Sequence, residues 1–137
     1  MFPTETVTRL TILVVDDEEA TRSVLCWVLE DGGNVVHTAP DGAEALTLLH
    51  AQKPIDIVVS DINMPGMDGL ALSKRIEAEF PQIPVLLISG RPRPPDVLAF
   101  LAKPFGSNAL SREMARLTAA RTSSPQPDAP AVEASDE

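Results

Sequence analysis

Short apolar runs that alternate with amphipathic segments are the feature that most limits the fold of this chain. The run TILVV at 11–15 is apolar and rich in β-branched residues, which is typical of a strand buried on both faces. Residues 18–33 follow with helical spacing and end at Gly32-Gly33, a pair that suits a helix C-cap. This strand-then-helix order repeats along the chain, so the sequence predicts a doubly wound α/β sheet with parallel strands.

The remaining strands and helices follow in the same order. We predict further strands at 34–39, 54–60, 83–89 and 97–102, and further helices at 42–52, 67–80 and 106–120. Asp41 can cap the helix that begins at 42. Sheets of this kind bind ligands at the carboxyl ends of their strands, so the residues that follow each strand are the first candidates for a functional site.

The connection between the last two predicted strands is unusually short. Only seven residues, GRPRPPD, separate Ser89 from Val97, and three of them are proline. Parallel neighbours usually need a crossover of about a dozen residues or more, so either these strands are not parallel neighbours or a helix is missing. A strand of this length spans roughly 17 Å. Seven residues cover that distance as extended chain, about 22 Å, but not as helix, about 10 Å.

If the two strands are parallel neighbours, the link must therefore be largely extended, with at most a single turn near Pro95. The prolines favour this conformation because they fix φ and bias the residues before them away from helix. The fourth helix is then missing or reduced to a loop, and the flank of the last two strands near Phe100 is thinly covered.

Composition and charge limit the function classes. The 137 residues suit one domain, which we place at 9–120, between a lead-in at 1–8 and a disordered, acidic tail rich in Pro, Ala and Ser at 121–137. The net charge of −9 argues against direct nucleic-acid binding, and no apolar run is long enough to span a membrane. A single cysteine, Cys26, excludes an intrachain disulfide and fits a reducing cytoplasm.

Polar side chains lie at the carboxyl ends of four of the predicted strands. These are Asp16 with Asp17, then Asp61, Ser89 and Lys103. In a parallel sheet they meet at one edge, where three carboxylates repel one another unless a proton or a cation intervenes. Oxygen donors without a nearby His or Cys pattern favour Mg²⁺ over zinc. A lysine and a hydroxyl beside that metal form a clamp for an oxyanion, and a phosphoryl group is the obvious occupant.

Four short motifs, in order and on the expected elements, carry a family resemblance. With VVDDEE at 14–19, SDINMPGMDG at 60–69, Ser89-Gly90 and KPF at 103–105, the chain resembles the receiver domain of bacterial two-component response regulators from about residue 9 to 120. The resemblance implies a flavodoxin-like five-stranded sheet of order 2-1-3-4-5. It also implies that Asp61 accepts a phosphoryl group from a histidine kinase or a histidine phosphotransfer protein.

The resemblance assigns roles to further residues. Mg²⁺ would be held by Asp16, Asp17, Asp61 and the backbone carbonyl of Asn63, and the phosphoryl oxygens would be bound by Ser89 and Lys103. Phe100 stands where the family has its switch aromatic, which acts together with Ser89. The Lys103–Pro104 bond is usually cis in this family. In the loop NMPGMDG, Gly66 and Gly69 suit tight turns that let backbone groups approach the site.

The predicted first helix is apolar on more than one side. At about 100° per residue, Leu25 and Leu29 share one side, while Val24 and Trp27 lie on the adjoining one. Either all four belong to one wide buried stripe, or Val24 and Trp27 are partly exposed and dock the phosphodonor, as the matching surface does in the family. Pro104 and Phe105 are the other docking candidates.

Two rival functions remain. Phosphatases that use an aspartyl-phosphate carry a second Asp two positions after the nucleophile, where this chain has Asn63, so that reading is poor. A phosphorylation-independent adaptor is the better rival, although the complete Asp, Ser and Lys set argues against it. We therefore expect a cytoplasmic signalling phosphoacceptor rather than an enzyme, with Mg²⁺-dependent self-phosphorylation and dephosphorylation as its only chemistry.

Several properties stay open at this point. The downstream protein is unknown, and self-association into a homodimer is open. The chain is either a single-domain regulator or a piece of a larger protein. We expect His37 and His50 on the surface without a partner.

Overall fold

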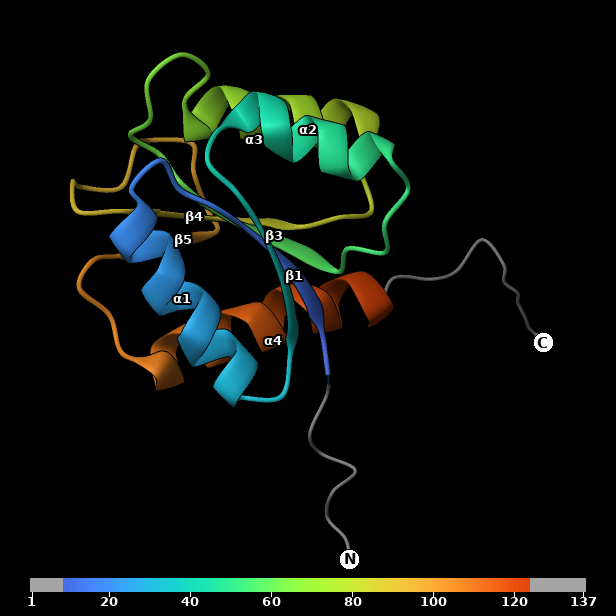
Figure 1. The fold of residues 1–137 in the computed structure, drawn as a ribbon, viewed down its shortest axis with the longest axis vertical. Helices are drawn as coiled ribbons and strands as arrows, with labels where there is room; N and C mark the ends of the chain where they lie inside the picture. Colours follow the sequence, from blue (N-terminus) through green and yellow to red (C-terminus); the bar gives the residue numbers. More distant parts are fainter. Residues whose placement is uncertain (1–8, 124–137) are drawn as a thin grey trace, which may run out of the picture.

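A five-stranded parallel sheet forms the centre of the molecule, with helices on both faces (Figure 1). The computed structural model describes residues 9–123, and the strand order is β2-β1-β3-β4-β5, which confirms the predicted fold. The strands are β1 (Thr11–Val15), β2 (Val35–Ala39), β3 (Ile57–Asp61), β4 (Val85–Ser89) and β5 (Phe100–Ala102). The helices are α1 (Glu19–Asp31), α2 (Gly42–His50), α3 (Gly69–Glu79) and α4 (Ser107–Ser123).

The continuous apolar runs form strands because both faces of the sheet are covered. In Figure 1, α2 and α3 lie on one face and α1 and α4 on the other. Residues of β1 alternate between two separate cores: Ile12 and Val14 belong to one, and Leu13 and Val15 to the other. All four side chains are fully buried, so every position of the run except its first residue needs an apolar side chain.

Helix ends agree with the expected capping residues. The Asp41 carboxylate accepts a hydrogen bond from the Glu44 N–H at 2.8 Å and begins α2. Gly32 is the C-cap of α1, and Gly33 follows with φ of 94°, a conformation that glycine adopts without strain. These local signals correctly place the end of α1 and the start of α2.

The short link between the last two strands is an extended loop, as predicted. β4 and β5 are parallel neighbours, with Leu87 opposite Phe100. Between them the chain makes one turn, at residues 95–96, where the Val97 N–H donates to the Pro94 carbonyl at 3.3 Å. The Arg93 guanidinium donates to the Val97 carbonyl at 2.7 Å and braces this turn. The residues between β4 and β5 form no helix, so α4 is the helix that follows β5.

The last strand is shorter than predicted. We placed a strand at 97–102, but β5 comprises only Phe100–Ala102, because residues 97–99 are still part of the returning link. The pairing with β4 begins only where the Leu87 N–H donates to the Ala99 carbonyl at 3.0 Å. An apolar run shows which residues avoid water, but it does not show how many of those residues are needed for the connection instead of the strand.

The end of the last helix also differs from our boundary. α4 continues to Ser123, so three residues that we assigned to the tail are helical. The predicted lead-in at 1–8 and the rest of the predicted tail, 124–137, lie outside the described residues. Within the described part of the chain, no helix is both long and apolar enough to cross a membrane.

Gly69 connects the fold to the candidate site, because α3 begins against the backbone that carries Asp61. A Cβ on Gly69 would collide with the Asp61 carbonyl oxygen and lie 2.7 Å from the Ile62 Cα. The glycine is therefore required for close approach and has no positive φ, whereas Gly66 does adopt a positive φ of 74° in the preceding turn.

We predict that Gly69→Ala lowers the free energy of unfolding by about 1–3 kcal/mol, because backbone rather than a movable side chain must shift. Gly106→Ala is the matched control, since a Cβ there meets nothing within 4 Å. We expect the control to stay within about 0.5 kcal/mol of the parent protein. Urea unfolding followed by circular dichroism measures both, and equal unfolding midpoints for the two variants would contradict the close-approach argument.

Candidate functional site

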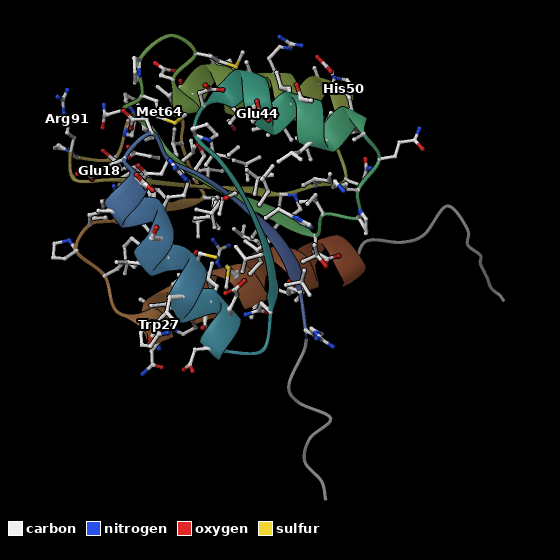
Figure 2. All side chains as sticks on the ribbon, in the orientation of Figure 1. Glu18, Trp27, Glu44, His50, Met64 and Arg91 are labelled. Carbon is white, nitrogen blue, oxygen red and sulfur yellow. The ribbon has the colours of Figure 1, made fainter. Side chains whose placement is uncertain are left out.

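Acidic, hydroxyl and lysine side chains converge at the carboxyl edge of the sheet. Asp61 and Ser89 are the last residues of β3 and β4, and Asp16 and Lys103 directly follow β1 and β5. The Lys103 Nζ lies 3.5 Å from Asp61 Oδ1 and 3.7 Å from Asp16 Oδ2. In Figure 2, Glu18, Met64 and Arg91, which come from the segments after β1, β3 and β4, gather around this same end of the molecule.

Three carboxylates form the acidic part of the site. Asp16, Asp17 and Asp61 each offer an oxygen, and these oxygens lie within 4.8 Å of one another. Asp16 and Asp61 are buried, with 1% and 7% of their surface exposed, whereas Asp17 is exposed. The cluster therefore opens to solvent on the side of Asp17.

Burial raises the pKa of Asp16, and the negative charges of Asp61 and Asp17 raise it further. The Glu18 N–H, which donates to Asp16 Oδ1 at 2.9 Å, and the Lys103 ammonium act in the opposite direction. The other oxygen, Oδ2, is buried and has no hydrogen-bond donor among the described residues. A buried, under-coordinated carboxylate oxygen between two further carboxylates fits a hard cation such as Mg²⁺.

Two residues that donate hydrogen bonds to the backbone of Asp16 and Asp61 were missed by sequence reasoning. The Arg22 Nη1 donates to the Asp16 carbonyl at 2.7 Å, and the Ser60 hydroxyl donates to the Asp61 carbonyl at 2.9 Å. Ser60 is adjacent to the nucleophile candidate and could have been noticed. Arg22 could not have been noticed, because whether its side chain contacts the Asp16 carbonyl depends on where α1 begins.

Ser89 lies at the edge of the site, but its hydroxyl donates its hydrogen bond to Asn63 and not to a carboxylate of the acidic cluster. Its hydroxyl donates to Asn63 Oδ1 at 2.9 Å and accepts from the Arg91 N–H at 3.0 Å. The resemblance had assigned only the backbone carbonyl of Asn63, as a metal ligand. The side chain of Asn63 therefore has a contact of its own, with the residue expected to bind phosphoryl oxygens.

The other candidates are placed as follows. Phe100 is half-buried at the start of β5. The Lys103–Pro104 bond is cis, as the resemblance implied. Pro104 is exposed, whereas Phe105 is half-buried and packs against the core on the α1 and α4 side, so little of its ring is free to dock a partner.

The reading of α1 as one wide buried stripe is wrong. Leu25 and Leu29 are buried, but Val24 is 60% exposed and Trp27 is 69% exposed. In Figure 2, Trp27 points away from the sheet. The helix thus has a buried side and a separate, exposed apolar patch formed by Val24 and Trp27.

Known proteins match both the sequence and the fold. A family model described as the response regulator receiver domain matches residues 12–115. The 14.6 kDa protein in the sodA1 3' region of Leptolyngbya boryana is 39% identical over 104 residues, which are 74% of this chain and 78% of that protein. The response regulator MprA of Mycobacterium sp. (strain KMS) is 34% identical over 129 residues, 88% of this chain but only 56% of MprA.

A solved structure agrees. The response regulator protein TrrA of Thermotoga maritima, in complex with Mg²⁺-BeF, is 29% identical with a TM-score of 0.72, over 79% of this chain and 98% of TrrA. The family model spans the chain from β1 into α4, and with it every strand end that contributes an acid or the lysine. The chain therefore belongs to the response regulator receiver domain family of two-component signalling.

Proposed function

We propose that Asp61 accepts a phosphoryl group from a phosphohistidine on a histidine kinase or a histidine phosphotransfer protein, and that this transfer switches the binding of a downstream protein. The observation that carries the proposal is the position of Lys103, whose Nζ lies within 4 Å of both buried carboxylates. A fixed cation beside Asp61 stands where negative charge collects during phosphoryl transfer.

The transfer uses one carboxylate oxygen of Asp61 as the nucleophile. That oxygen forms a bond to phosphorus while the phosphorus–nitrogen bond to the donor imidazole breaks, and the bonding electrons stay on the imidazole nitrogen. Lys103 neutralises part of the charge on the phosphoryl oxygens without supplying a proton. Asp16, Asp17, Asp61 and the backbone carbonyl of Asn63 would hold Mg²⁺, which, when bound, stabilises the same negative charge.

The Ser89 hydroxyl takes part only after a rearrangement. It carries one proton, and that proton is donated to Asn63 Oδ1. To donate to a phosphoryl oxygen on Asp61, Ser89 must release Asn63, and the Arg91 N–H that donates to Ser89 then has to adjust. The loop of residues 90–99 begins directly after Ser89, so a movement of Ser89 on phosphorylation would also move this loop and Phe100, the proposed switch residue.

The exposed patch of Val24 and Trp27 is the proposed docking surface for the phosphodonor. α1 begins three residues after Asp16, so its surface adjoins the site where the phosphohistidine must enter. An exposed Trp is the residue type that most often dominates binding energy in an interface. Pro104 adds an exposed apolar group next to Lys103, whereas Phe105 contributes mainly to packing.

Asp61→Asn should abolish phosphoryl uptake, because the amide removes the nucleophile. The experiment mixes the protein with Mg²⁺ and acetyl phosphate and then weighs the intact protein. We expect the parent protein to gain the mass of one phosphoryl group and the variant to gain none. A parent protein that gains no mass would favour the phosphorylation-independent adaptor, and a variant that reacts at the parent rate would exclude Asp61.

Mg²⁺ should stabilise the parent protein against unfolding, because its ligands are assembled only in the folded state. At a Mg²⁺ concentration of about 100 times Kd the expected gain is about 2.7 kcal/mol. Asp16→Asn and Asp61→Asn should lose most of this gain. Without Mg²⁺, Asp61→Asn should be at least as stable as the parent protein, since one of the three repelling charges is gone.

Thermal unfolding with and without Mg²⁺ checks this prediction. Asp31→Asn, an exposed change at the last residue of α1, is the matched control and should keep the full Mg²⁺ effect. An equal Mg²⁺ effect in all three variants would rule out the acidic cluster as the binding site.

Trp27→Ala should slow phosphoryl transfer from the cognate kinase roughly tenfold, the effect of losing about 1.4 kcal/mol of docking energy. Uptake from acetyl phosphate should not change, because the small donor does not contact α1. Leu98→Ala is the matched control, since Leu98 is also exposed but lies on the loop of residues 90–99. Equal slowing with both donors would point to damage to the core instead of loss of docking.

A further inference from the structure

Asp16 has a hydrogen-bond partner at every polar group except one carboxylate oxygen. Its N–H donates to the Ala39 carbonyl at 3.2 Å, and its carbonyl accepts from the Arg22 Nη1 at 2.7 Å. Its Oδ1 accepts from the Glu18 N–H at 2.9 Å. Only Oδ2, which lies 3.7 Å from the Lys103 Nζ, has no hydrogen-bond partner in the described part of the chain. The three hydrogen bonds therefore fix Asp16 and leave Oδ2 available to a cation.

The Arg22 side chain supplies the hydrogen bond that the sheet does not. Val15, the last residue of β1, is paired with Ala39, the last residue of β2, so the Asp16 carbonyl lies just beyond the paired residues. Asp16 is 1% exposed, and a buried carbonyl without a donor is unfavourable. The same carbonyl belongs to the peptide group that joins Asp16 to Asp17. A donor that fixes this peptide group therefore fixes two of the three acids.

The start of α1 places the guanidinium at this carbonyl. The Arg22 N–H donates to the Glu18 carbonyl at 3.0 Å in the first turn of the helix, and the Thr21 hydroxyl donates to Glu18 Oε1 at 2.6 Å. Arg22 is half-buried. Because the Glu18 N–H also donates to Asp16, the segment of residues 16–22 is closed by hydrogen bonds at both its backbone and its side chains.

We propose that Arg22 is a positioning residue for the cation site, which acts by holding the peptide group between Asp16 and Asp17. Arg22 acts through Asp16, because its hydrogen bond goes to the backbone carbonyl and not to a carboxylate oxygen of the cluster. Groups that orient the ligands of a metal commonly change its affinity about 10–100-fold when they are removed. The inference rests on the proposed function only in so far as Asp16 and Asp17 hold Mg²⁺, and it does not require phosphoryl transfer.

The charge of Arg22 and its hydrogen bond have opposite effects on Mg²⁺ affinity. A guanidinium near a cation site repels the cation, so loss of the positive charge alone would strengthen Mg²⁺ binding. Loss of the hydrogen bond frees the peptide group after Asp16 and would weaken binding. The direction of the change therefore shows which of the two effects dominates.

The test is isothermal titration calorimetry of Mg²⁺ binding to the full, unphosphorylated chain. Arg22→Met keeps an unbranched side chain but removes the donors and the charge, and we expect the Kd for Mg²⁺ to rise about tenfold. Arg22→Lys keeps a donor and the charge and should recover most of the affinity. Arg112→Met removes an exposed arginine of α4 and is the matched control, which should bind Mg²⁺ like the parent protein. Circular dichroism checks that each variant is folded, and Arg22→Ala replaces Arg22→Met if the latter is unfolded.

Three results would overturn the inference. An unchanged Kd for Mg²⁺ in Arg22→Met would mean that the hydrogen bond supports only the fold, and a lower Kd would mean that charge repulsion dominates. A lysine variant that binds no better than the methionine variant, or a parent protein that binds no Mg²⁺, would also overturn it. A parent protein that binds Mg²⁺ but gains no phosphoryl group from acetyl phosphate would contradict the proposed function alone.

Discussion

The Lys103 ammonium between two buried carboxylates is the contact on which the site depends. Asp16 and Asp61 are almost inaccessible to water, and two such charges side by side are unfavourable in a protein interior. Lys103 lies within 4 Å of both and provides one positive charge against them. With Asp17 the cluster carries three negative charges against one positive charge, so a divalent cation fits there. Burial and the neighbouring carboxylates raise the pKa of Asp16.

Parallel pairing is what assembles this arrangement. β1 and β3 are neighbours at the centre of the sheet, with Val15 opposite Ser60, so the residues that follow on each strand, Asp16 and Asp61, emerge side by side. The pairing of β4 with β5 sets Ser89 opposite Ala102, which delivers Lys103 one position later. No single local sequence holds the site together; it exists because the carboxyl ends of four parallel strands, β1, β3, β4 and β5, share one edge of the sheet.

The loop of residues 90–99 relates the site to the surface of the molecule. Its first residues contact Ser89, and its later residues form one side of a groove against α3. A change in the position of Ser89 therefore acts on the same segment that carries Leu98. In this receiver a loop, not a helix, joins β4 to β5, and the segment from Ser89 to Phe100 runs from the proposed phosphoacceptor site to the groove beside α3.

Much of the fold could be read from the sequence because its signals are local. Alternating apolar runs specify strands covered on both faces, Asp41 and Gly33 specify helix ends, and seven residues between Ser89 and Val97 leave no room for a helix. The same reasoning placed the acids and the lysine at one edge, because the carboxyl ends of parallel strands must meet there. These conclusions need only chain geometry and the cost of exposing apolar groups to water.

Tertiary structure alone decided the contacts between residues far apart in the chain. The Ser89 hydroxyl at the end of β4 donates to the Asn63 side chain, which lies just after the neighbouring strand β3. His50, which we expected to lack a partner, has its Nε2 2.9 Å from a carboxylate oxygen of Glu79 in α3. Periodicity could not settle which apolar side of α1 is exposed, because Leu25 and Trp27 look alike until the sheet covers one of them. The sequence by itself determined which elements form and which strand ends carry chemistry, since these follow from neighbouring residues. Partners, exposed faces and the groove beside Leu98 follow from packing, which neighbouring residues do not encode.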